Sequence, residues 1–204
     1  ELALRQTGAR GWLDGDDPDP AFSPGDRVCW RLRVNFNDGI DTRNATVTDF
    51  IPPNTSYESG SATVTATNTA VVVDGDPLID VDAETLTWRL GTDLDEDACT
   101  PDTEDCYVEP GAVFDVVFSV IANDDPAAGN AFDIIDNLMK FSAANTVGEV
   151  FPLRDSVNYE LAQPILGLDK TNDATTALVQ GDDVVYSLEI ANAGNEPALD
   201  IEVW

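Results

Sequence analysis

The stretch "RVCWRLRV", residues 27 to 34, decides the fold class. Apolar side chains occupy every second position, and a cysteine and arginines occupy the positions between them. Because successive side chains of a strand point to opposite faces, this alternation is typical of a β-strand with one buried face. The positions predicted to face the core are Val28, Trp30, Leu32 and Val34.

Several other segments show the same alternation and are rich in β-branched and aromatic residues. They are "ATVTDF" (45–50), "SATVTATNTAVVV" (61–73), "ETLTWRL" (84–90) and "AVFDVVFSVI" (112–121). Residues 130–147 fit both a helical and an alternating spacing, and we interpret them as a strand. Since no crossover helices separate the strands, the pattern predicts an all-β antiparallel sandwich. The aromatic side chains predicted to fill the cores are Trp30, Trp88, Phe118 and Tyr186.

An internal repeat divides the chain. "SPGDRVCWRLRVNFNDG" (23–39) lines up with "VQGDDVVYSLEIANAG" (179–194), so that Trp30 matches Tyr186. On either side, "LALRQT" (2–7) resembles "LGLDKT" (166–171), and "ATVTD" (45–49) resembles "IEVW" (201–204). We therefore predict a complete sandwich in residues 1–162, the first unit, and the opening three strands of another in residues 163–204, the second unit.

The repeated pattern resembles the β-sandwich repeat catalogued as domain of unknown function eleven. The resemblance rests on a Gly-Asp turn, an alternating strand with an aromatic residue, a short Asn/Gly loop and a strand ending in Asp and Pro. "PGDRVCWRLRV" (24–34) and "PGAVFDVVFSVIA" (110–122) carry it in the first unit, and "QGDDVVYSLEIANAG" (180–194) carries it in the second. It implies an immunoglobulin-like β-sandwich, and a structural or adhesive role in secreted or cell-surface proteins of bacteria and archaea, commonly in tandem.

Three strands cannot close a sandwich, because one apolar face of their sheet would stay uncovered. We expect the second unit to be completed by a continuing chain or by β-strand addition from a neighbouring subunit. Either route gives a homopolymer or tandem array. The residues that need a partner are Val184, Tyr186, Leu188, Ile190 and Ile201.

The acidic composition narrows the choice of partners. The chain has 39 Asp and Glu against 10 Lys and Arg, a formal net charge of -29, and no histidine. The electric field of so negative a chain repels phosphate backbones and anionic lipid headgroups, which argues against nucleic acid and a membrane surface as partners. The sequence has no run of 18 apolar residues, so we expect no direct membrane insertion of this chain. Without histidine the chain cannot form a Ser-His-Asp or Cys-His catalytic site, so we expect no enzyme and no catalytic residue.

Calcium is the cofactor that the acidic loops favour, because alternate carboxylates in a Gly-containing loop can supply oxygen ligands. No loop has the full EF-hand spacing. Turn-forming aspartates on a solvated acidic surface, or adaptation to a salty habitat, explain each loop equally well. The candidate ligands are Asp14, Asp16, Asp19, Asp74, Asp76, Asp80, Asp82, Asp93, Asp95 and Asp97.

Cys99 and Cys106 flank a turn-rich segment and are predicted to form a disulfide, which suits an exported protein. Cys29 is then left over. It could bond between subunits, pair instead with one of the other two, or lie free. "NAT" at Asn44 and "NTS" at Asn54 match the glycosylation acceptor pattern.

Together these features predict a non-enzymatic, extracellular structural protein of a filament, stalk or surface layer. The alternative is an adhesin or a carbohydrate-binding accessory module, which needs an exposed aromatic platform. Trp12, which fits no alternating strand, is the candidate for that platform, although it could equally plug one end of the sandwich. Lys170 lies in the first strand of the second unit, where some surface sandwiches carry a cross-linking lysine; its counterpart is Gln6, and we interpret Lys170 as a surface side chain.

Overall fold

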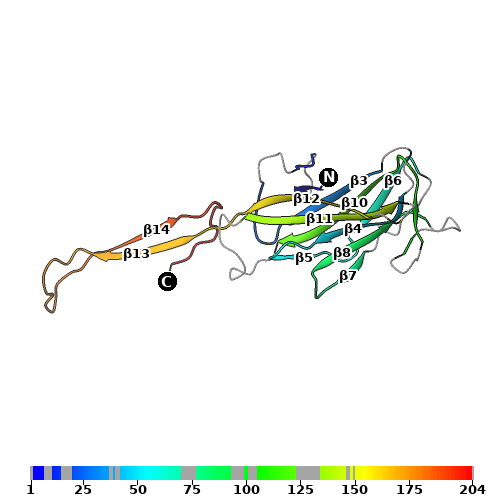
Figure 1. Cartoon of the computed structure of the whole chain (residues 1–204). Coiled ribbons are helices and arrows are strands. Elements are labelled where there is room, and N and C mark those ends of the chain that lie inside the picture. The colour runs from blue at the N-terminus through cyan, green and yellow to red at the C-terminus, as the bar shows by residue number, and fades with distance from the viewer. Residues whose placement is uncertain are drawn as a thin grey trace.

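The described residues form two packed sheets and a projecting hairpin (Figure 1). The computed structural model describes residues 2–6, 11–14, 20–36, 39, 42–69, 77–92, 99–100, 105–122, 134–145, 148 and 150–203. Every regular element in these residues is a strand. Within the same residues, no helix has the length and apolar character needed to cross a membrane.

The first sheet, sheet A, is antiparallel and is centred on β3 and β10. These two strands pair from Val113 opposite Asn35 to Ile121 opposite Arg27, and β1 covers the other edge of β3. The strands of sheet A are β1 (Leu2–Gln6), β3 (Arg27–Asn35), β10 (Val113–Ala122), β5 (Thr55–Tyr57) and β6 (Thr63–Thr67).

The second sheet, sheet B, packs face to face against sheet A. Its pairings are antiparallel, except that β2 adds in parallel to the end of β12. Its strands are β2 (Ala21–Phe22), β12 (Val150–Leu161), β11 (Ile134–Asn145), β4 (Thr42–Phe50), β8 (Thr85–Leu90), β7 (Leu78–Asp80) and β9 (Tyr107–Val108).

The core lies between the two sheets. Trp30, Trp88 and Phe118 are fully buried, and the Trp88 and Phe118 rings lie 5.4 Å apart between centroids. Tyr159 of β12 packs edge-on against Phe22 of β2, with 5.2 Å between ring centroids. Each fully buried large apolar side chain contributes roughly 1.5–3 kcal/mol to folding, so these side chains hold the two sheets together.

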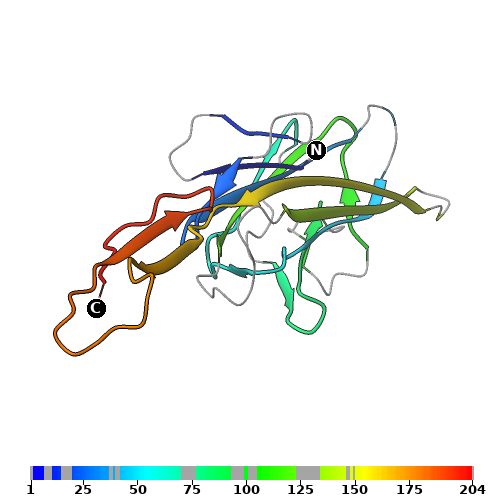
Figure 2. The same ribbon diagram turned by 90° about the vertical axis from the view of Figure 1, so that its left-hand side faces the viewer.

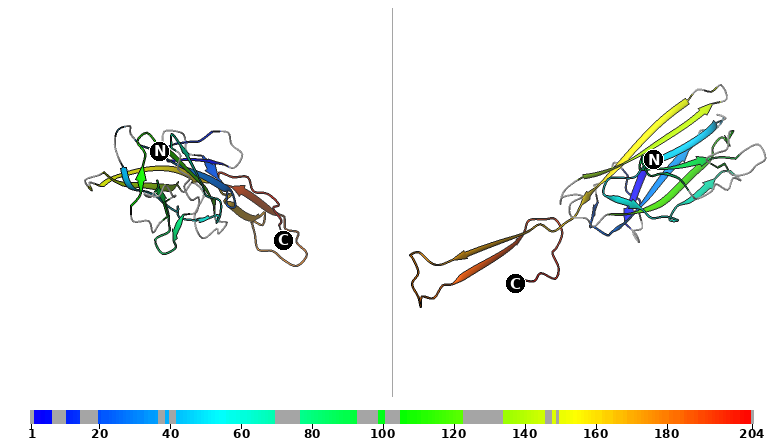
Figure 3. Two further views of the ribbon diagram at one scale, coloured as in Figure 1. Left: turned by 90° about the vertical axis from the view of Figure 1, so that its right-hand side faces the viewer. Right: turned by 90° about the horizontal axis from the view of Figure 1, so that it is seen from below.

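The third sheet is the hairpin of β13 (Leu166–Asn172) and β14 (Tyr186–Asn192). The long strand β12 leads out of the sandwich into it, and the hairpin extends away from that end of the sandwich (Figures 1, 2 and 3).

The strand predictions for the first unit are confirmed where the structure describes them. Residues 27–34, 45–50, 84–90 and 112–121 lie in or overlap β3, β4, β8 and β10, and the ambiguous segment forms β11. The prediction for residues 61–73 was too long, because β6 ends at Thr67. Residues 70–76 lie outside the described residues. The very short strands β2, β5, β7 and β9 were missed, since two or three residues show no readable alternation.

Candidate assembly surface

The two units build the same tight turn from a Gly-Asp pair. In the first unit, the Ser23 N–H donates to Asp26 Oδ2 at 3.0 Å, and the Asp26 N–H donates to the Ser23 carbonyl at 3.0 Å. In the second, Val179 and Asp182 make the same two bonds at 2.9 and 3.1 Å.

The glycine between these residues has a positive φ in both turns, +88° at Gly25 and +103° at Gly181, a conformation that favours glycine. The repeat read from the sequence is therefore a repeat of local structure.

The hairpin of the second unit has one apolar face and one polar face. Lys170 lies opposite Leu188, and Leu168 lies opposite Ile190, so these side chains share one face with Tyr186. The other face carries Asp169, Thr171, Ser187 and Glu189. In the first unit, the face matching the apolar one is the inner surface of sheet A.

The apolar face of the hairpin is exposed. Tyr186 is 57% exposed, whereas its counterpart Trp30 is fully buried. The expectation that Tyr186 fills a core is therefore wrong for the residues described, because sheet A's counterpart has no opposing sheet here. Leu188, Ile190 and Ile201 are also exposed, and Val184 is partly so. The Lys170 ammonium lies 4.6 Å from the centre of the Tyr186 ring, and its side chain is exposed.

One edge of β14 has no partner strand in the described part of the chain. In the first unit, β3 pairs with β1 on one side and β10 on the other. The end of β10 also binds the Gly-Asp turn: the Gly25 N–H donates to the Ala122 carbonyl at 2.8 Å, and the Ala122 N–H donates to the Asp26 carbonyl at 2.9 Å. The second unit repeats the turn and pairs β13 with β14, as the first unit pairs β1 with β3. The described residues of the second unit include no counterpart of β10.

The third predicted strand of the second unit is absent: residues 201–203 are not in a strand. Their counterpart β4 lies in sheet B, where it pairs with β8, β9 and β11. All of these strands come later in the sequence of the first unit. A strand needs a hydrogen-bonded neighbour, so alternation in this segment was not enough to make one.

The pairing register of the hairpin also differs from that of the first unit. Gln6 lies opposite Val28, but its counterpart Lys170 lies opposite Leu188, the counterpart of Leu32. This four-residue slip keeps every side chain on its face, because the side-chain period of a strand is two. Phe22, whose strand β2 pairs with β12 in sheet B, is buried in the first unit, whereas its counterpart Leu178 is exposed.

A loop of the second unit is hydrogen-bonded to the end of the sandwich. The Asn195 side chain donates to Glu160 Oε1 at 2.5 Å and to the Leu161 carbonyl at 3.2 Å, and it accepts from the Gln163 N–H at 2.9 Å. A Cβ at Gly194 would lie 2.1 Å from the Gln163 carbonyl oxygen, so only glycine allows this approach. These contacts fix the direction in which the hairpin leaves the sandwich.

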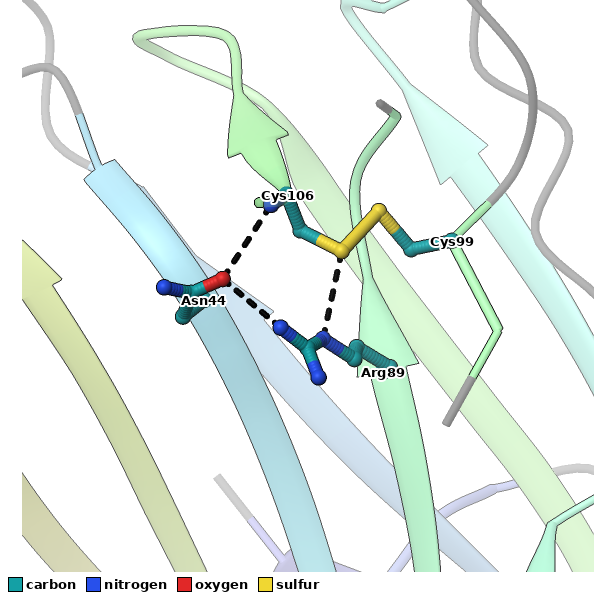
Figure 4. The surroundings of a disulfide bond; sticks show 4 residues. All are labelled: Asn44, Arg89, Cys99 and Cys106. Atoms are coloured by element: carbon teal, nitrogen blue, oxygen red, sulfur yellow. Dashed lines mark hydrogen bonds between the residues drawn. A yellow bond between two sulfur atoms is a disulfide. The ribbon is translucent and has the colours of Figure 1, made fainter. Parts of the chain in front are cut away.

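Cys99 and Cys106 form a disulfide, the pairing that the sequence favoured (Figure 4). The Asn44 carboxamide oxygen beside it accepts from the Cys106 N–H at 3.1 Å and from Arg89 Nη2 at 2.7 Å. Asn44 has a φ of +51°, a conformation that Asn adopts more readily than most residues. The disulfide thus anchors the start of β4. Cys29 stays outside it, with Sγ 3.5 Å from Ser119 Oγ.

The glycosylation patterns stay predictions. Asn44 is half-buried and its carboxamide oxygen is engaged, while Asn54 is half-buried with a φ of +60°.

The calcium prediction also stays open. Asp14, Asp80 and Asp82 are described; Asp16, Asp19, Asp74, Asp76, Asp93, Asp95 and Asp97 lie outside the described residues. Where side chains are described, no three acidic groups gather as a metal cluster. Asp80 Oδ1 instead accepts the N–H groups of Asp82 and Ala83 at 3.1 and 3.0 Å, as a turn-forming aspartate does.

Trp12 lies against two arginines. The Arg5 and Arg31 guanidinium carbons lie 4.3 and 5.0 Å from the centre of its ring, and the side chain is half-buried. Cation–π contacts of this kind tie the loop of Trp12 to β1 and β3. Trp12 is therefore held by contacts with both strands, and its use as an aromatic platform stays a prediction.

Comparison with known proteins identifies the architecture. No family model matches the chain, and no curated protein matches it. Among solved structures, it resembles BcpA, the major pilin subunit of Bacillus cereus, with a TM-score of 0.54 at 12% identity over 97% of this chain. It resembles the BspA_C_WT structure with a TM-score of 0.50 at 15% identity over 92% of this chain, and the RrgB pilus backbone of Streptococcus pneumoniae with a TM-score of 0.46 at 12% identity over 97%.

The chain spans 56% of the length of BcpA and 59% of each of the other two. At these identities the likeness concerns fold. The chain has an all-β, immunoglobulin-like sandwich architecture.

Proposed function

We propose that this chain is a non-enzymatic structural module of an extracellular filament, stalk or surface layer, built from immunoglobulin-like repeats in tandem. The observation that carries the proposal is the second unit, which repeats the turn and the paired opening strands of the first but exposes the face that the first buries. An exposed apolar face and an unpaired strand edge favour completion by further strands.

We expect the strands that complete the second unit to come from the same polypeptide. If a second copy supplied the missing neighbour of β14 from its own β10, that strand would have to leave a core in which its inner side chains, such as Phe114 and Phe118, are fully buried. Withdrawing β10 would dismantle a complete sandwich. A strand on the same chain also has a far higher effective concentration than one on another molecule.

The joint between the units fits an extended assembly. Asn195 and Gly194 hold the second unit against the end of β12, so successive sandwiches would keep a defined direction and form an extended rod. The net charge of -29 keeps such a rod soluble. BcpA, whose fold this chain resembles, is a major pilin subunit, which supports the assignment to a surface assembly.

Labelling of intact cells tests this function. Antibodies raised against residues 1–162 should decorate unpermeabilised cells of the source organism, and immunogold electron microscopy should place the label along filaments or in a continuous layer. Label that appears only after permeabilisation would contradict a surface role.

A further inference from the structure

Asp49 and Asn137 form a buried polar pair in the apolar core. Neither side chain has exposed surface. Asp49 lies on β4 opposite Met139 of β11, and Asn137 lies two residues before Met139 on the inner face of the same sheet. Asn137 Nδ2 donates to Asp49 Oδ2 at 3.0 Å. Nothing in the proposed function uses this pair.

The hydrogen bonds of the pair are incomplete if Asp49 is ionised. Asp49 Oδ1 and Asn137 Oδ1 are both buried, and neither has a hydrogen-bond partner. Both are acceptors, and leaving a buried acceptor without a donor destabilises the folded state. A carboxylate has no hydrogen to offer, but a protonated carboxyl group has one O–H donor. That hydrogen is the donor that the two oxygens lack.

The surroundings also favour the neutral acid. Leu86 and Trp88 of β8, Val157 of β12 and Phe118 of β10 line the core around β4 and β11. The titratable side chains described at inner positions of these layers are Tyr159 and Asp155 of β12 and Tyr57 of β5, and the described inner positions carry no lysine or arginine. Asp155 lies opposite Met139 but is exposed, and its Oδ2 accepts the Leu2 N–H at 2.7 Å.

Loss of hydration on burial also favours the neutral form of the Asp49 carboxyl group. Burial raises the pKa of Asp49 to about 8, and the hydrogen bond from Asn137 lowers it by less than burial raises it. Burial likewise raises the pKa of Tyr159.

We propose that Asp49 is a proton-binding site of the folded protein, in which its neutral carboxyl group donates to the Asn137 carboxamide oxygen and accepts from the Asn137 amide. The two hydrogen bonds form a ring that joins β4 to β11 across sheet B. The ligand is a proton, and the site exists only when the sandwich is folded. Raising the pH removes the proton and leaves a buried carboxylate with a single hydrogen bond.

The sign of the pH effect follows from linkage. The folded pKa lies above the unfolded value of 3.8, so the folded protein holds a proton that the unfolded chain has released. The stabilisation is complete below about pH 4 and is lost as the pH rises through the folded pKa. Between these limits the unfolding equilibrium constant increases about tenfold per pH unit. The chain has no histidine, so no side chain with an ordinary pKa titrates between pH 5 and 7.

Urea denaturation of the full chain at pH 5, 6 and 7 tests the proposal against Asp49→Asn. Asparagine keeps the shape and can form the same ring with Asn137, but it does not titrate. The unfolding constant of the wild type should increase about a hundredfold over these two pH units relative to the variant. Asp115→Asn is the matched control, because Asp115 is a partly exposed carboxylate bound to Arg33 at 2.6 Å on the outer side of sheet A; its profile should follow the wild type.

Parallel pH profiles for the wild type and Asp49→Asn would overturn the proposal. If Asp49→Asn does not fold, carbon-13 NMR of the Asp49 carboxyl group in the wild type gives an independent answer. A neutral carboxyl shift at pH 6 supports the proton site, and an ionised shift at that pH refutes it.

Discussion

Ending the chain at Gln163 should leave the sandwich folded and cooperative. The deletion removes β13, β14 and the loop that grips the end of β12, but it keeps the bond from the Ala162 N–H to the Phe22 carbonyl at 2.8 Å. The side chains of β13 and β14 are exposed, so their removal takes no packing from the core.

The expected loss can be worked out from the joint. The deletion removes three hydrogen bonds of Asn195, two to Glu160 and Leu161 of the sandwich and one from Gln163, the last residue kept, and each contributes about 0.5–1.5 kcal/mol net. Because the site is only partly buried, the lower part of that range applies, and we expect the free energy of unfolding to fall by about 1.5–3 kcal/mol. By comparison, removing a single buried aromatic side chain costs about 3–5 kcal/mol.

Urea denaturation followed by tryptophan fluorescence measures this loss, because Trp30 and Trp88 lie in the core. The dependence of the free energy on urea concentration should hardly change, since the core surface exposed on unfolding is the same. A truncated chain that is unfolded, or a loss above about 5 kcal/mol, would refute the division of the chain after the first unit.

Four further results are expected. Trp88→Ala should lower the free energy of unfolding by about 3–5 kcal/mol in the same assay, whereas substitution of exposed Leu188 by Ser should change it by less than about 0.5 kcal/mol. Reducing the Cys99–Cys106 disulfide should cost about 2 kcal/mol, as its short loop implies, measured by denaturation with and without a reductant. Gly194→Ala should loosen the joint, broadening the distance distribution between spin labels on the sandwich and the hairpin, and should lower the free energy of unfolding of the sandwich by no more than the truncation does. If the acidic loops bind calcium, melting in CaCl2 should occur at a higher temperature than in NaCl of equal ionic strength, and equal melting temperatures would contradict that binding.

Alternation in the sequence was enough to predict the sandwich and its main core residues. Val28, Trp30, Leu32 and Val34 point inward because their strand, β3, is paired on both sides, with β1 and β10. The same alternation failed at Ile201, where the strands that would pair with it are not among the described residues. Pairing partners decide whether an alternating segment becomes a strand, and they lie far away in sequence.

The buried pair was missed although its signal was present. In "ATVTDF", Asp49 follows Ala45 and Val47 at every second position, so the alternation places it on the inner face. Asn137 similarly occupies an inner position between Ile135 and Met139. What the sequence does not contain is their nearness, which comes from the register of β4 against β11. The hydrogen bonds of Asn195 to β12 could not be predicted either, because they too join residues that are distant in sequence.

The intact mass of the native polypeptide under denaturing and reducing conditions tests the central claim most directly. If further strands of the same chain cover the apolar face and open edge of β14, as we propose, the measurement should give a single covalent polypeptide well above the 21.9 kDa of this sequence. A native mass of 21.9 kDa would contradict it, because the second unit would then have to be completed by another molecule.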